Sequence, residues 1–278
     1  MPEELFPDVI AGLRDGEVAL PMSRPGVGDS PWGEPGSMWA ALVRVGNAWG
    51  RVTSRRAWSA RGWETFLKGL AKFPAGAEMH IVELDANGYS RHGDRAHITA
   101  RIASEHGQWF RMGCEFETFP DGPHNRIARI TNEDARRFLW RMVQDMPVTY
   151  GGVGDDWRPN GQTMLEMRQA RDAMLGVAES RSVLRGYPWV TVCAPEIAAR
   201  LGGPDMLRAS GAFHEVWELP TGAVWLQATE RLTDYEGQAL HRVFRTVAPV
   251  LPPGKPKPYL GQEMGRIVYE EPRGFGAA

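Results

Sequence analysis

Residues 95–119 read RAHITARIASEHGQWFRMGCEFETF and contain the clearest structural signal in the chain. Apolar and polar residues alternate through 95–103, and the same alternation recurs through 109–119. A period of two is typical of strands in an antiparallel sheet that has one apolar and one polar face. The intervening sequence Glu-His-Gly-Gln at 105–108 suits a hairpin turn. The stretch therefore predicts two antiparallel strands joined by a tight turn.

The sequence before this hairpin contains a third strand signal, a helix signal and an irregular segment. Residues 79–84 are apolar and are followed by the turn-like sequence Asp-Ala-Asn-Gly at 85–88. A helix is predicted over Trp58–Phe73, where apolar residues recur on one face until Pro74. Residues 1–37 interleave prolines with glycines, so we expect an irregular arm there.

The sequence after the hairpin contains three possible helix starts. Thr131, Thr163 and Thr233 are each followed three positions later by an acid, which is the capping-box pattern. The helix that begins after Thr163 is expected to continue as one element to Val177. Residues 150–157, Tyr-Gly-Gly-Val-Gly-Asp-Asp-Trp, are interpreted as a flexible loop.

The last third of the chain repeats the succession of strands and helices. We predict a buried strand at 187–192, a short helix at 195–201, a hairpin formed by 213–219 and 223–229, and a final strand at 266–269. Strand pairs followed by helices, without strict β-α-β alternation, favour an α+β fold. We therefore expect antiparallel sheets with helices packed on one face, with two similar lobes as a further option.

The expected domain organisation has three parts. They are the Pro/Gly-rich arm at 1–37, an N-terminal α+β lobe at 38–150 and a C-terminal α+β lobe at 151–278. The alternative is that the two lobes form one continuous domain. The glycine-rich residues 151–161 are the best position for a boundary between them.

Composition excludes several classes of protein. The chain has 278 residues and a formal net charge of -2, which argues against general electrostatic binding to nucleic acid or to an acidic membrane. No secretory signal and no apolar run of membrane-spanning length is visible. The two cysteines, Cys114 and Cys193, are expected to be buried thiols. We therefore predict a cytoplasmic protein with no nucleic-acid or membrane partner.

Five potential metal ligands crowd one region but do not form a recognisable metal motif. They are His80, Asp85, His92, Asp94 and His97. No paired spacing of the kind that zinc sites use is present among them. We interpret the region as a solvated hairpin end, and we predict neither a metal nor another cofactor.

One short motif near His97 raises the possibility of catalysis. His97-Ile98-Thr99 has the His-x-Thr form of two-histidine phosphoesterases, in which each histidine acts as a general acid or base. That chemistry needs a second such motif, which the sequence lacks. No catalytic residue is therefore predicted, and an unrecognised enzyme site near His97, Arg101 and Glu115 is kept as an alternative.

Two groups of acids beside aromatic residues are candidates for binding a protein. Aromatic side chains serve as buried anchors at interfaces, while acids steer a basic partner toward the surface. The competing interpretations are a solvated loop for the first group and helix capping for the second. The candidate residues are Asp155, Asp156 and Trp157, and then Asp234, Tyr235 and Glu236.

Five stretches between about Arg136 and Pro256 resemble a known protein family. Their residues, in order, are 148–152 (VTYGG), 184–192 (LRGYPWVTV), 195–203 (PEIAARLGG), 222–229 (GAVWLQAT) and 247–252 (VAPVLP). In order and spacing they are similar to the immunity protein 52 family, and to related type VI immunity proteins, of bacterial polymorphic toxin systems.

The resemblance implies an α+β protein without catalytic activity that binds a cognate toxin domain and blocks its active site. Such a protein is expected to be a monomer or a weak homodimer. The matched residues suit scaffold roles, so the resemblance does not identify the toxin-binding surface. The alternatives are a scaffold subunit of a secretion or phage-related assembly, or the enzyme with a site near His97.

Overall fold

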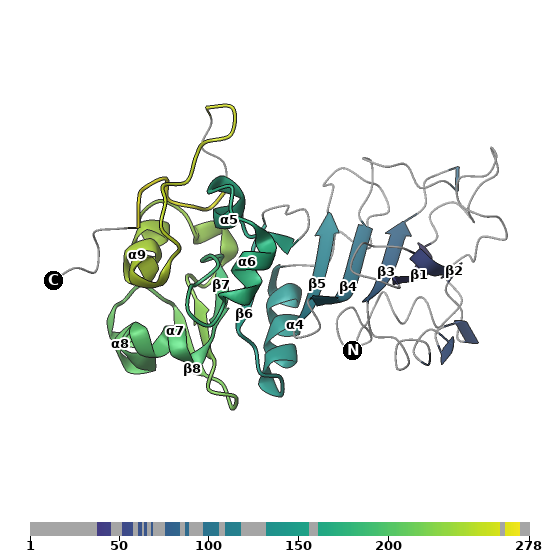
Figure 1. The fold of residues 1–278 in the computed structure, drawn as a ribbon, viewed down its shortest axis with the longest axis horizontal. Coiled ribbons are helices and arrows are strands. Elements are labelled where there is room, and N and C mark those ends of the chain that lie inside the picture. Colours follow the sequence, from purple (N-terminus) through teal and green to yellow (C-terminus); the bar gives the residue numbers. More distant parts are fainter. Residues whose placement is uncertain are drawn as a thin grey trace. The chain divides into compact units, whose positions relative to one another are not determined.

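The computed structural model contains two compact units, Met1–Asp134 and Ala135–Ala278 (Figure 1). The arm expected at 1–37 and most of the helix expected over Trp58–Phe73 lie outside the residues that the structure describes. The described residues are 38–45, 52–57, 61–62, 64–65, 68, 76–83, 87–88, 97–105, 109–117, 132–155, 161–261 and 265–272.

The N-terminal unit contains a five-stranded antiparallel sheet. The predicted hairpin is confirmed as β4–β5, in which Ile98 lies opposite Phe116 and Ile102 opposite Met112. The apolar residues of both strands therefore share one face. The strands occur in the order β2-β1-β3-β4-β5 and are β1 (Met38–Val45), β2 (Val52–Ala57), β3 (Gly76–Glu83), β4 (His97–Glu105) and β5 (Trp109–Glu117).

The C-terminal unit contains a four-stranded antiparallel sheet in the order β6-β7-β9-β8, with helices around it (Figure 1). Its strands are β6 (Tyr150–Val153), β7 (Val190–Cys193), β8 (Glu215–Glu218) and β9 (Val224–Gln227). Its α-helices are α4 (Asn132–Gln144), α5 (Met164–Arg168), α6 (Ala173–Ala178), α7 (Pro195–Arg200), α8 (Gly203–Ala209) and α9 (Gly237–Val247). The predicted helix at 195–201 and the predicted hairpin at 213–229 are confirmed as α7 and β8–β9.

Part of the segment expected to be a flexible loop is instead a strand. Tyr150 pairs with Cys193 and Val153 with Val190, so β6 belongs to the second sheet. Glycine is needed because a Cβ at Gly152 would lie 2.6 Å from Pro188 Cγ. The expected lobe boundary at 150/151 therefore falls inside a sheet, and the units divide between Asp134 and Ala135, within the first turn of α4.

The α+β class is confirmed, but the C-terminal sheet is not covered on one face only. Val192 and Trp225 lie on one face, Cys193 and Val224 lie on the other, and all four are fully buried. On the first face the Trp140 ring of α4 meets the Trp225 ring edge-on, with centroids 5.2 Å apart. Both faces of the two central strands are thus packed.

The helix expected from Thr163 to Val177 is divided into α5 and α6. The Thr163–Glu166 capping box is confirmed at the start of α5, but Ala170 has a φ of 52°, which ends the helix. Asp172 then caps α6 through its side chain. Thr131 lies outside the described residues.

The capping box expected at Thr233 is wrong. Thr233 lies inside a short 3-10 helix, Leu232–Asp234. The helix α9 begins at Gly237, where the preceding Glu236 makes no side-chain capping hydrogen bond.

The segment 266–269, expected to be a strand, is irregular but packs into the core. Ile267, Val268 and Tyr269 are buried, and the Val268 N–H donates to the Tyr187 hydroxyl at 2.9 Å. Among the described residues, no helix is both long enough and apolar enough to cross a membrane.

Candidate functional site

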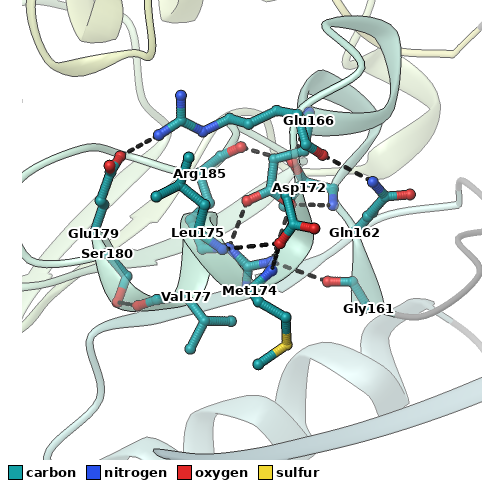
Figure 2. A network of polar contacts seen from close by, with 12 residues as sticks. Gly161, Gln162, Glu166, Asp172, Met174, Leu175, Val177, Glu179, Ser180 and Arg185 are labelled. Carbon is teal, nitrogen blue, oxygen red and sulfur yellow. Dashed lines mark hydrogen bonds and ion pairs between the residues drawn. The ribbon is translucent and has the colours of Figure 1, made fainter. Parts of the chain in front are cut away.

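A network of polar contacts in the C-terminal unit surrounds a buried ion pair between α5 and the segment before β7 (Figure 2). Glu166 is fully buried and Arg185 is nearly so. Arg185 donates from Nε to Glu166 Oε1 at 2.7 Å and from Nη2 to Glu166 Oε2 at 2.9 Å. This is the bidentate geometry that gives the strongest arginine–carboxylate pairs.

The remaining bonds of the network connect it to its own scaffold. Glu166 Oε2 also accepts from the Thr163 N–H at 2.8 Å, and the Thr163 hydroxyl donates to the Arg185 carbonyl at 2.6 Å. Arg185 Nη2 donates to the Gly161 carbonyl at 3.0 Å, and the guanidinium lies 5.3 Å from the centroid of the Tyr150 ring. A Cβ at Gly176 would overlap Glu166 Oε1. Both carboxylate oxygens of Glu166 accept hydrogen bonds from other residues of the chain, so we assign the network a structural role.

The first group of predicted binding residues is only partly described. Asp155 is exposed at the end of β6, but its carboxylate forms an ion pair with Arg266. That pair joins β6 to the C-terminal segment and neutralises the charge that we expected to steer a partner. Asp156 and Trp157 lie outside the described residues.

The second group of predicted binding residues contains one clear correction. Asp234 and Glu236 are exposed, as expected. Tyr235 is fully buried, and its hydroxyl donates to the Tyr187 carbonyl at 2.6 Å. The expectation that Tyr235 offers an exposed aromatic anchor is therefore wrong, because the ring fills the core beside a backbone acceptor.

A different exposed aromatic residue lies on the edge strand β8. Trp217 is 52% exposed, whereas tryptophan is highly buried on average. The helix α8, whose Arg208 Nε donates to the Val216 carbonyl of β8 at 3.2 Å, exposes Met206 to 61%. We call the exposed residues of these two elements, together with the partly buried Glu215, the β8 surface: Asp205, Met206, Arg208, Ala209, Glu215, Trp217 and Glu218.

Two of the three acids of the β8 surface are paired with arginines. Glu215 Oε2 lies 3.4 Å from Trp217 Nε1 and 3.7 Å from Arg136 Nη1, while Asp205 pairs with Arg208 at 2.6 Å. Glu218 is also exposed, but it follows Trp217 in the strand and therefore lies on the opposite face of β8. Arg208 already donates a hydrogen bond to a backbone carbonyl of the edge strand β8. A partner is therefore expected to contact the side chains of this surface rather than to add a strand to the sheet.

The sequence did not single out Trp217, although a weak signal was present. Trp217 pairs with Trp225 and therefore shares its face of the sheet, so alternation alone predicts the same burial for both residues. Trp225 is covered by Trp140, whereas Trp217 lies one strand further out. The acids that flank Trp217 in the sequence Glu-Val-Trp-Glu were the only indication of an exposed strand.

The polar face of the N-terminal sheet is defined only by its backbone register. His97 and Arg101 are four positions apart in β4, and Glu115 pairs with Thr99, so the backbone register places these three residues on one face. His80 lies opposite Thr99 on the same face. Asp85, His92 and Asp94 lie outside the described residues. Within the described part of the chain, no cluster of three or more His, Cys, Asp or Glu residues could hold a metal ion.

Two buried groups of the C-terminal unit are held in their neutral forms. Burial raises the pKa of the Cys193 thiol to about 12, although two backbone N–H groups act in the opposite direction. Burial likewise raises the pKa of the Tyr187 hydroxyl above its ordinary value. A buried thiol with a raised pKa has little thiolate character, which agrees with the predicted core role of Cys193.

Comparison with known proteins adds no relative: no protein-family model, curated protein or solved structure matches this chain. The resemblance to the immunity protein 52 family therefore stays a prediction.

Proposed function

We propose that this protein is an immunity protein that neutralises a cognate bacterial toxin domain by stoichiometric binding. The observation that supports the proposal is the β8 surface, where Trp217 is half exposed and donates from Nε1 to Glu215 Oε2 at 3.4 Å. The resemblance of residues 136–256 to immunity proteins supplies the class of partner, and the β8 surface supplies the place to bind it.

The size of Trp217 suits it to anchor an interface. A tryptophan side chain buries up to about 250 Å², and half of that area remains exposed here. Covering about 120 Å² of apolar surface is worth ~3 kcal/mol at 25 cal/mol per Å². Interface hot spots have this magnitude and are enriched in tryptophan. Losing the indole should therefore weaken the complex by about 100-fold.

Glu218 is expected to act on the rate of association. Glu218 is exposed, so its charge reaches the solvent and should accelerate encounter with a basic partner, whereas the charge of Asp205 is paired with Arg208. Salt should reduce this effect, because the Debye length is only about 8 Å at physiological ionic strength.

The proposal is tested with the toxin domain encoded next to this gene. Isothermal titration calorimetry should give a one-to-one complex, and co-expression should protect cells from the toxin. Trp217→Ala should weaken binding by about 100-fold. Leu175→Ala is the control, because Leu175 is also an exposed apolar residue but lies on α6.

Two outcomes would contradict the proposal. A wild-type chain that neither binds the neighbouring toxin nor protects cells against it would contradict the proposed immunity function. Binding by Trp217→Ala that is as tight as that of the wild type would contradict the assignment of the β8 surface. His97→Ala should leave protection nearly intact. Loss of a measurable turnover in that variant would instead indicate the enzyme alternative.

A further inference from the structure

A proline- and lysine-rich segment follows α9 and gathers positive charge on one part of the second unit. Residues 252–261, which we call the proline–lysine loop, read PPGKPKPYLG and contain two of the chain's four lysines. Lys255 and Lys257 are exposed, whereas Pro256 between them is buried. Two residues of chain span at most about 7 Å, so the two lysine side chains leave the backbone close together and extend into the solvent.

Hydrogen bonds to α5 and to the C-terminal segment fix the base of the loop. The Gly254 N–H donates to Glu271 Oε1 at 2.8 Å. The Lys257 N–H donates to the Arg168 carbonyl at 2.8 Å, which holds the backbone of the loop beside the end of α5. A segment that is ordered in this way loses little conformational entropy when a ligand binds to it.

Arg168 supplies a third cation next to the loop. Its guanidinium carbon lies 5.4 Å from the centroid of the Tyr259 ring, a cation–π contact that holds the side chain against the loop. Arg168 Nε is buried without a hydrogen-bond partner. Among the described residues no carboxylate forms an ion pair with Arg168, whereas the nearby Arg171 is paired with Glu179. The described structure therefore leaves the charge of Arg168 without an acid to neutralise it.

The three cations suit an elongated anion better than a compact one. Lys255 and Lys257 are two residues apart, and Arg168 is held at Tyr259, a further two residues along the loop. Four residues of chain span up to about 14 Å. A lone phosphate therefore meets only part of this row, whereas a chain of two or three phosphates reaches more of it. Arginine and lysine are both common phosphate ligands in proteins.

We propose that the proline–lysine loop and Arg168 form a binding site for a polyphosphate group. The group is inorganic polyphosphate or the phosphate chain of a nucleoside triphosphate, because both present the same charges to the three cations. Tyr259 is 57% exposed, so a nucleoside base has an aromatic surface on which to stack beside the phosphates. The site shares no residue with the β8 surface, and the proposal does not depend on toxin binding.

The affinity is expected to be modest, because both lysines are exposed to water. Three charge-assisted contacts give a dissociation constant on the order of 1 mM. Binding should weaken as salt is added, because the Debye length is only about 8 Å at physiological ionic strength. Losing one cationic contact should weaken binding about tenfold.

Isothermal titration calorimetry of the full chain with tripolyphosphate at low ionic strength tests the site. The wild type should bind one tripolyphosphate per chain. Arg168→Gln and the double variant Lys255→Gln/Lys257→Gln should each bind at least about tenfold more weakly. Both lysine side chains are exposed and Lys257 keeps its backbone hydrogen bond, so the double variant should unfold at the wild-type urea midpoint. Arg245→Gln is the control, because Arg245 is also an exposed cation but lies on α9.

Two comparisons between probes identify the ligand. Inorganic phosphate should bind at least about tenfold more weakly than tripolyphosphate, because it reaches fewer of the cations. Tighter binding of ATP than of tripolyphosphate, lost in Tyr259→Ala, would assign the site to nucleotides. Equal binding of ATP and tripolyphosphate would assign it to the phosphate chain alone.

The proposal would be overturned by a wild-type chain that shows no saturable binding of tripolyphosphate. Variants that bind tripolyphosphate as tightly as the wild type would also overturn it, as would an equal loss of binding in Arg245→Gln. Inorganic phosphate that binds as tightly as tripolyphosphate would contradict the assignment to an elongated anion. If Arg168→Gln is unstable, the double lysine variant decides the question alone.

Discussion

Replacing Arg185 with methionine should strongly destabilise the C-terminal unit, because Glu166 would stay buried without its counter-charge. The substitution removes two charge-assisted hydrogen bonds to Glu166, of 2.7 and 2.9 Å, and a third to the Gly161 carbonyl. The Thr163 N–H would then be the remaining donor shown for the carboxylate. Breaking a buried ion pair in this way costs about 3–5 kcal/mol.

A loss of about 4 kcal/mol is large compared with the total stability of a domain, which is about 5–15 kcal/mol. Urea denaturation, followed by tryptophan fluorescence and far-UV circular dichroism, measures the change. With a slope of about 2 kcal/mol per molar urea, the midpoint should fall by about 2 M. Should Arg185→Met fail to fold, Arg185→Lys keeps the charge but loses the bidentate geometry, so it should lie between methionine and wild type.

A surface ion pair of the chain provides a matched control. Arg181 donates to Glu196 at 2.8 Å, but both side chains are about half exposed. The pKa of Glu196 is lowered by its own backbone N–H and by Arg181. Arg181→Met should cost less than about 1 kcal/mol, because exposed pairs are screened by water.

A double-mutant cycle separates the pair from its surroundings. If the reasoning holds, Glu166→Gln and Arg185→Met should be strongly coupled, so that the double variant loses much less than the sum of the single variants. A folded Arg185→Met variant no less stable than Arg181→Met, or additive effects in the cycle, would refute the reasoning.

Two further predictions concern the core. Tyr235→Phe removes the buried hydroxyl that donates to the Tyr187 carbonyl, so urea denaturation should show a loss of about 1–2 kcal/mol in the free energy of unfolding. Toxin binding should stay unchanged. A variant that is as stable as the wild type but binds the toxin less tightly would contradict the buried role of Tyr235. In a Cys114→Ser background, Cys193 should resist alkylation at pH 8 until urea unfolds the chain, because its folded pKa is raised to about 12. An unfolded thiol has a pKa of about 8.5, so burial of Cys193 should lower the free energy of unfolding progressively as the pH rises above that value. Rapid alkylation of the native chain would contradict the burial of this thiol.

Local patterns predicted the elements whose signals lie within a few residues. The alternation in 95–119 predicted β4–β5, and the turn at 220–222 predicted β8–β9. The two N-terminal strands β1 and β2 were missed, because Met38–Val45 is a nearly continuous apolar run and Val52–Ala57 is mostly polar, so neither shows alternation. Gly151 and Gly152 suggested a loop, although their missing side chains permit close packing in β6.

The candidate site was harder to predict, because the exposure of a side chain depends on which residues from other elements pack over it. Tyr235 lies between two exposed acids, yet its ring is buried. Trp217 shares a sheet face with the buried Trp225, yet only Trp225 lies under Trp140. Sequence spacing gives the face on which a side chain lies but not the extent of the layer that covers it.

The sequence by itself determined the α+β class, the two hairpins, the capping box at Thr163 and the buried Cys193, since each depends on neighbours close along the chain or on strand period. Only the tertiary structure decided that Glu166 meets Arg185, that β6 joins the second sheet and that Trp217 stays exposed. Those features arise from contacts between residues far apart in the sequence. Such contacts depend on how whole elements pack, which no local pattern encodes.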